Sequence, residues 1–132
     1  MKWISADQHD LVPASHEDPR SPGVLKRVLA GREDFQVGHV QMLNWAVLPG
    51  LSSFQPHYHE DMQEIFVIIS GSVEMTVSGE SRRLNSGDAV LVDPEEIHVM
   101  RNLLETEAEY LVFGVSSGKD GRTVNVNSNG SC

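Results

Sequence analysis

Short runs of apolar residues, interrupted every few positions by turn-forming residues, constrain the fold of this chain more than any other feature. The runs are rich in Val, Ile and Leu, which favour extended structure. No segment keeps an amphipathic 3.6-residue period for more than about two turns of helix. We therefore expect an all-β chain, arranged as a sandwich or a closed barrel, with strands over residues 23–29, 37–48, 62–69, 73–77, 89–92, 97–102 and 110–115.

Chain length and local composition divide the sequence into three parts. The 132 residues are enough for one domain with a substantial core and no disulfides. Residues 1–22 include three prolines and several charges, and we expect an irregular N-terminal arm there. Residues 23–115 then form the barrel. Residues 116–132 are rich in Gly, Ser and Asn, which predicts a polar C-terminal tail or a final edge segment.

The charge balance limits the partners and the location that we expect. A formal net charge of −9 and a pI near 5.0 argue against nucleic acid, which requires a basic face, and against an anionic membrane surface. No segment approaches the roughly 20 apolar residues of a membrane-spanning helix. Residues 1–7 lack the apolar core of a signal peptide, and Cys132 is the only cysteine. We predict a cytoplasmic protein that binds neither nucleic acid nor membranes.

Three histidines and one glutamate are spaced as ligands of a metal ion. His57 and His59 are two residues apart, so in a strand both side chains point to the same face. Glu64 lies five positions after His59, an odd offset that would place it on the opposite face of an unbroken strand. A turn or bulge at residues 60–61 would direct Glu64 back to the same side. His98 must then arrive from a separate strand.

Three imidazole nitrogens and one carboxylate oxygen are a donor set that suits Mn, Fe, Co, Ni or Zn. An ion that takes six ligands would keep two positions open for water, substrate or dioxygen. A His-x-His pair alone is weak evidence, because six histidines in 132 residues give roughly 0.3 such pairs by chance. The residues around the pair decide how specific the signal is.

Two longer patterns carry a family resemblance. The first is Gly50-x6-His57-x-His59-x4-Glu64-x6-Gly71, and the second is Gly87-x10-His98-x3-Asn102. Together they resemble the two conserved motifs of the cupin superfamily, with one extra residue between Gly50 and His57. The resemblance spans residues 49 to 102 and is typical of a small single-domain cupin.

The resemblance implies a double-stranded β-helix, or jelly-roll barrel, with a metal held inside by residues 57, 59, 64 and 98. It also implies a homodimer, and it makes Asn102 a structural hydrogen-bonding residue. Asp93 and Glu95 depart from the pattern, because the family usually has a proline and a glycine there. These departures affect the turn before His98 but remove no ligand.

Other polar residues have simpler interpretations. We expect His9 and His16 to be solvated histidines of the arm, since histidines in polar segments are mostly exposed. His39 is interpreted as a cross-strand or surface residue. The Arg82-Arg83 pair predicts a charged, exposed edge.

Strand alternation also predicts a partial substrate pocket with an apolar lining. Phe54 and Gln55 would lie at its mouth, and the inward-facing residues would be Phe66, Ile68, Val90 and Met100. For strand 37–48 the sequence leaves two faces open. One face carries residues 39, 41, 43 and 45, and the other carries residues 40, 42, 44 and 46.

These features support three hypotheses about function. The first is a metal-dependent, dioxygenase-like oxidoreductase acting on a small organic substrate, with Glu64 as a possible base. The second is a sugar or sugar-phosphate isomerase, in which Lys26 or Arg27 would bind the phosphate. The third is a non-catalytic, metal-containing module that binds or senses a small molecule. The ligands specify a metal but not a substrate.

Overall fold

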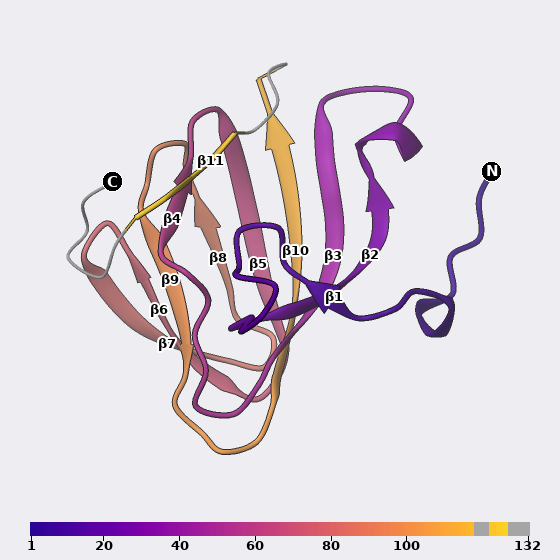
Figure 1. The fold of residues 1–132 in the computed structure, drawn as a ribbon. Coiled ribbons are helices and arrows are strands. Elements are labelled where there is room, and N and C mark those ends of the chain that lie inside the picture. Colours follow the sequence, from indigo (N-terminus) through magenta and orange to yellow (C-terminus); the bar gives the residue numbers. More distant parts are fainter. Residues whose placement is uncertain (118–121, 127–132) are drawn as a thin grey trace.

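Two antiparallel sheets make up almost all of the regular structure (Figure 1). The structure is a computed structural model that describes residues 1–117 and 122–126. The larger sheet has the strand order β1 (Val12–Pro13), β2 (Leu25–Gly31), β3 (Val40–Leu48), β10 (Ala108–Ser116), β5 (Met62–Ser70) and β8 (Ala89–Val92). The smaller sheet has the order β11 (Thr123–Asn125), β4 (His57–His59), β9 (His98–Asn102), β6 (Ser72–Val77) and β7 (Glu80–Asn85). The predicted all-β, jelly-roll fold is confirmed.

The core forms between the sheets, because alternate residues of each strand point to the same side. In β5 the buried positions are Met62, Glu64, Phe66 and Ile68, and the residues at 63 and 65 are exposed. In β10 the buried positions are again every second residue from Ala108 to Ser116. The same alternation that buries the core therefore also turns Glu64 inward.

All seven predicted strands are present, but β7 was not predicted. Five of its six residues are exposed, and only Leu84 is buried. It is an edge strand, paired on one side with β6, and its charged residues include Arg82 and Arg83. Charged side chains are a common protection of sheet edges, so such a strand shows no apolar alternation in the sequence.

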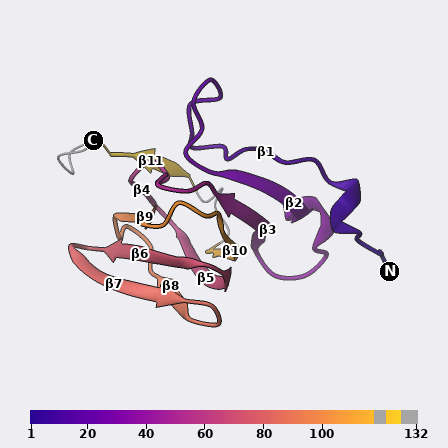
Figure 2. The same ribbon diagram turned by 90° about the horizontal axis from the view of Figure 1, so that it is seen from below.

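The N-terminal segment is more ordered than its composition indicates. It contains the short 3-10 helix η1 (Ala6–Gln8), and its strand β1 pairs with β2. A second 3-10 helix, η2 (Arg32–Asp34), follows β2. The loop between β1 and β2 lies between two strand pairs, β2–β3 and β4–β11 (Figures 1 and 2). Ala14 and Val24, at the two ends of this loop, are both buried.

The last predicted segment is partly described. Thr123–Asn125 form β11, which pairs with β4 at the edge of the smaller sheet, and Val126 is buried. Residues 118–121 and 127–132, including Cys132, lie outside the described residues. Among the described residues, no helix has the length and the apolar character needed to cross a membrane.

Candidate metal centre

The four predicted ligands meet inside the barrel. His57 and His59 come from β4, Glu64 from β5 and His98 from β9. One donor atom from each residue lies within 4.8 Å of the donor atoms of the other three, and all four side chains are buried. The chain bends at residues 60–61, between β4 and β5, as the odd offset between His59 and Glu64 required.

Strand pairing fixes where each ligand arrives. His57 lies opposite His98 in the β4–β9 pair, so the two rings approach from neighbouring strands. Their centroids are 4.4 Å apart. Glu64 comes from the other sheet, where it pairs with Gly114 of β10 and Val92 of β8. The cluster therefore joins the two sheets.

Hydrogen bonds to the outer ring nitrogens orient two of the imidazoles. The Nδ1 of His57 lies 2.7 Å from the carbonyl oxygen of Gln55, and the Nδ1 of His98 lies 3.0 Å from that of Glu96. A carbonyl oxygen can only accept, so each Nδ1 must carry the proton. Each Nε2 then points a free lone pair at the centre of the cluster, which is how a ligating histidine is usually held.

The inner atoms lie close together without satisfying one another. Oε1 of Glu64 lies 2.8 Å from Nε2 of His59 and 3.2 Å from Nε2 of His98. All three atoms are buried, and none has a hydrogen bond of acceptable geometry among the described residues. For His98 this contact sets a lone pair against a carboxylate oxygen, which is unfavourable in a buried site unless a cation lies between them. The donor set therefore fits a divalent transition metal.

Burial sets the charge state of the cluster. It lowers the pKa of His57 to about 2, with further lowering from the neighbouring His98 and His16, so this ring is neutral and able to ligate. Burial by itself raises the pKa of the Glu64 carboxyl. Positive charge at the Nε2 atoms of His59 and His98, supplied by a proton where a metal ion would otherwise lie, outweighs that effect and holds the pKa well below its usual range. A neutral imidazole and an anionic carboxylate are the forms that bind metal.

Asn102 has the structural role that the motif predicted. Its Nδ2 donates to the carbonyl oxygens of Leu48, Pro49 and Thr106 at 2.8–3.2 Å, and its Oδ1 accepts from the Leu104 amide at 3.0 Å. It is buried at the end of β9. This side chain thus fastens the end of β3 to the turn after the strand that carries His98.

The turn before His98 has a backbone conformation that favours glycine, although Glu95 occupies the position. Glu95 has a φ of 68°, in the left-handed region that favours glycine, and the family usually has glycine at this position. Its amide donates to the carbonyl oxygen of His59 at 2.7 Å. The bond connects the turn to β4 and holds Glu95 in this strained conformation.

A cavity of about 480 Å³ adjoins the metal cluster, and its lining differs from the prediction. Phe54 and Phe66 line it as expected. Ile68 and Met100 are instead fully buried in the core, and Val90 packs against that core. On β5 the cavity borders Met62, Glu64 and Phe66 but does not extend to Ile68. Gln55 is exposed, and its side chain donates to the Val126 carbonyl oxygen.

The predicted apolar lining is only part of the cavity wall. Polar side chains from three segments also line the cavity: His16 from the arm, Lys26 from β2, and Gln41 and Asn44 from β3. The sequence left open whether Lys26 or Arg27 turns inward, and only His16 was expected elsewhere. The face of β3 that turns inward carries Met42, Asn44 and Ala46, which decides between the two faces left open. A register shift lets Gln41 reach the cavity as well.

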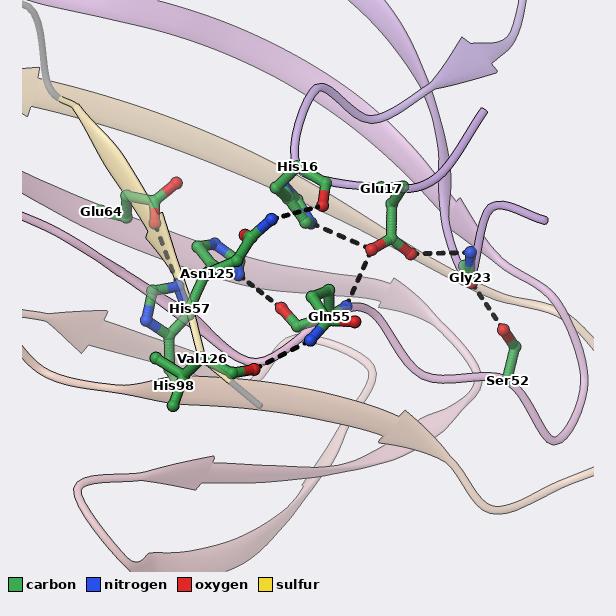
Figure 3. Close-up of polar contacts among 10 residues, drawn as sticks. All are labelled: His16, Glu17, Gly23, Ser52, Gln55, His57, Glu64, His98, Asn125 and Val126. Atoms are coloured by element: carbon green, nitrogen blue, oxygen red, sulfur yellow. Dashed lines mark hydrogen bonds and ion pairs between the residues drawn. The ribbon is translucent and has the colours of Figure 1, made fainter. Parts of the chain in front are cut away.

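The solvated-loop interpretation of His16 was also wrong. Its side chain is only 15% exposed and stacks on the His57 ring with centroids 4.1 Å apart (Figure 3). Burial lowers its pKa to about 4, against an opposing effect of Glu64. His16 is not part of the four-residue cluster, and its Nε2 is buried without a hydrogen-bond partner among the described residues.

Glu17 holds the arm in this position. Its carboxylate accepts hydrogen bonds from the amides of Gly23 at 2.6 Å and Gln55 at 2.9 Å (Figure 3). The Ser52 hydroxyl donates to the Gly23 carbonyl oxygen at 2.6 Å. A side chain at position 23 would collide with the carbonyl oxygen of Ser53, so glycine permits this close approach. No local pattern in the sequence signals these long-range contacts.

Comparison with known proteins identifies the family. A cupin domain model matches residues 43–114, more than half of the chain. The chain belongs to the cupin domain family. The matched segment runs from β3 to β10 and includes the four residues of the cluster, whereas it leaves out the arm with His16 and Glu17.

Relatives with similar sequences cover most of this cupin. A protein of Aquifex aeolicus (strain VF5) is 26% identical over 111 residues, which are 76% of this chain and 92% of the relative. The pectin degradation protein KdgF of Dickeya dadantii (strain 3937) is 26% identical over 83 residues, 63% of this chain and 70% of the relative. The crystal structure of a predicted oxalate decarboxylase from Thermotoga maritima is similar with a TM-score of 0.77 and 23% identity, covering 87% of this chain and 99% of that one. This last likeness establishes the fold.

Proposed function

We propose that this cupin is a metal-dependent enzyme that acts on a small polar organic substrate, with the ion held by His57, His59, Glu64 and His98. One observation carries the proposal. Three buried, mutually unsatisfied donor atoms converge beside a cavity of about 480 Å³, which is the size of a small-molecule site. A cluster that borders such a cavity is accessible to a ligand, whereas a purely structural site is closed.

The polar lining favours the isomerase-like hypothesis over the others. A bound divalent ion supplies Lewis acidity toward a carbonyl or hydroxyl oxygen. The residues of this chain would bind and orient the substrate: Asn44 and Gln41 offer hydrogen-bonding groups on one wall. Glu64 faces the cavity as a carboxylate whose pKa is held well below its usual range, which suits a metal ligand better than a base. The aromatic rings of Phe54 and Phe66 exclude water from the far side.

A dioxygenase-like oxidoreductase is the second candidate, because three histidines and one glutamate also suit Fe or Mn. Metal identity and oxygen consumption separate the two candidates. Protein reconstituted with Fe(II) that consumes oxygen with a phenol, diketone or thiol supports the oxidoreductase. Carbonyl–hydroxyl isomerisation that proceeds equally well with a redox-inert ion supports the isomerase-like function.

Elemental analysis of protein purified without a chelator tests the metal centre. We expect about one transition-metal ion per chain, and His59→Ala should weaken binding by more than about 100-fold, since even removal of an outer hydrogen-bond partner costs 10- to 100-fold. His39→Ala is the matched control, because His39 is exposed and outside the cluster. Full metal retention in His59→Ala would contradict the assignment of the ligands.

A further inference from the structure

Lys26 stands out among the residues of the cavity because its charge is unmatched. It lies on β2, lines the cavity and is half-buried, and this burial lowers its pKa. Among the described residues, no hydrogen bond or ion pair involves its ammonium group. The chain carries 19 acidic residues against ten basic ones, so an unpaired cation inside the cavity is unexpected.

Removing a charge from water without a partner costs free energy, and proteins usually avoid it by pairing the charge. The nearby carboxylates do not serve this purpose. Glu17 is committed to the amides of Gly23 and Gln55, and Glu64 faces the histidine rings. Glu33 also lines the cavity, but it is exposed and forms no ion pair with Lys26. The missing anion is therefore best supplied by a ligand.

Two further polar atoms in the same cavity lack a hydrogen bond. Asn44 Oδ1 and His16 Nε2 are buried and have no hydrogen-bond partner among the described residues, and Nε2 of His16 lies 3.9 Å from Oε2 of Glu17, beyond hydrogen-bond distance. Lys26 lies opposite Ala46 in the β2–β3 pair, and Asn44 lies two residues from Ala46 on the same face. Lys26 and Asn44 are thus diagonal positions on the face of the β2–β3 pair that lines the cavity, and the His16 ring faces the same cavity from the arm.

We propose that Lys26 binds an anionic group of the substrate, a carboxylate or a phosphate, while Asn44 and His16 bind its hydroxyl groups. The substrate class is then a small hydroxylated acid or sugar phosphate that extends from Lys26 toward the metal cluster. The inference rests on the proposed function only for the end of the substrate that would reach the metal ion. Arg27, the other cation of this strand, points away and donates to the carbonyl oxygen of His9.

The test uses metal-free protein, because an anion also binds directly to an ion. Glycerate, glycerol 3-phosphate and glycerol are the probes, since they share hydroxyl groups and differ in the charged group. Affinities are measured by saturation-transfer NMR after dialysis against EDTA. Lys26→Met removes the charge and keeps the length of the side chain, Lys26→Gln is a second neutral variant, and Lys26→Arg keeps the charge. Arg82→Met makes the same change of net charge at an exposed position on β7.

Wild-type protein should bind at least one of the two anions about 10- to 100-fold more tightly than glycerol, as expected of a hydrogen bond to a charged group. The tighter anion distinguishes carboxylate from phosphate. The neutral variants should lose this preference with glycerol binding unchanged, and Lys26→Arg and Arg82→Met should keep it. No preference in wild type, or a preference that survives in a folded neutral variant, overturns the proposal. Failure of wild-type protein to take up Zn(II) would overturn the proposed metal centre. It would not change the Lys26 test, which is carried out on metal-free protein.

Discussion

Two regions of this cupin contribute to the same cavity in different ways. The strands β4, β5 and β9 supply the metal cluster at positions fixed by strand periodicity and pairing. The arm supplies His16 at a position fixed by one carboxylate, that of Glu17, which bonds to amides 6 and 38 residues away in the sequence. The comparison shows that a regular element carries its geometry in its sequence spacing, whereas an irregular segment depends on single long-range contacts.

The largest loss of stability should come from Asn102, which ties together the strands around the metal cluster. Asn102→Ala leaves three carbonyl oxygens and one amide without their partner, so we expect a loss of about 3 kcal/mol in the free energy of unfolding. Urea denaturation measures this loss. Asn85→Ala is the matched control, because Asn85 is exposed, and it should cost less than about 1 kcal/mol. Equal losses in the two variants would show that Asn102 contributes no more to the free energy of unfolding than an exposed asparagine does.

An intermediate effect is expected in the arm. Glu17→Gln keeps one acceptor oxygen and replaces the other with an NH2 group, so one of the two backbone amides loses its acceptor and faces a donor. The loop between β1 and β2 should therefore loosen by about 1–2 kcal/mol. Hydrogen exchange at the Gly23 and Gln55 amides should accelerate about 5- to 30-fold, with no change in β9. Asp18→Asn is the control, since the Asp18 side chain is exposed and, among the described residues, bonds to Arg20 alone. If hydrogen exchange in β9 accelerates equally, the arm and the strands that carry the metal cluster unfold as one cooperative unit.

The smallest effect concerns the turn where the motif departs from its family. Glu95→Gly should relieve the strain of a positive φ and stabilise the protein by about 0.5–1 kcal/mol. The expected change is a rise in Tm of about 2–4 °C, measured by circular dichroism. Glu95→Ala removes the same side chain but keeps the strain, so it should give no rise. A gain of the same size in both variants would assign the effect to the side chain rather than to the backbone.

The same contrast explains how much of the molecule could be predicted. The cluster was predictable because His57, His59 and Glu64 are close in sequence and a bend at residues 60–61 was the simplest way to unite them. The strands were predictable because a buried face repeats every second residue. The polar lining was not, since it requires knowing whether Lys26 or Arg27 turns inward, which face of β3 it meets, and that His16 stacks on His57.

The two segments that close the cavity beside the cluster are far apart in the chain, and this separation orders the steps of folding during synthesis. His16 is made early, yet its carbonyl oxygen accepts a hydrogen bond from Asn125, 109 residues later, and the Thr123 hydroxyl pairs with Nδ1 of His59. The arm therefore leaves the ribosome long before most of its docking surface exists. The cluster is completed by His98, but the wall around it is completed only after residues 123–126 have been translated and have joined β4.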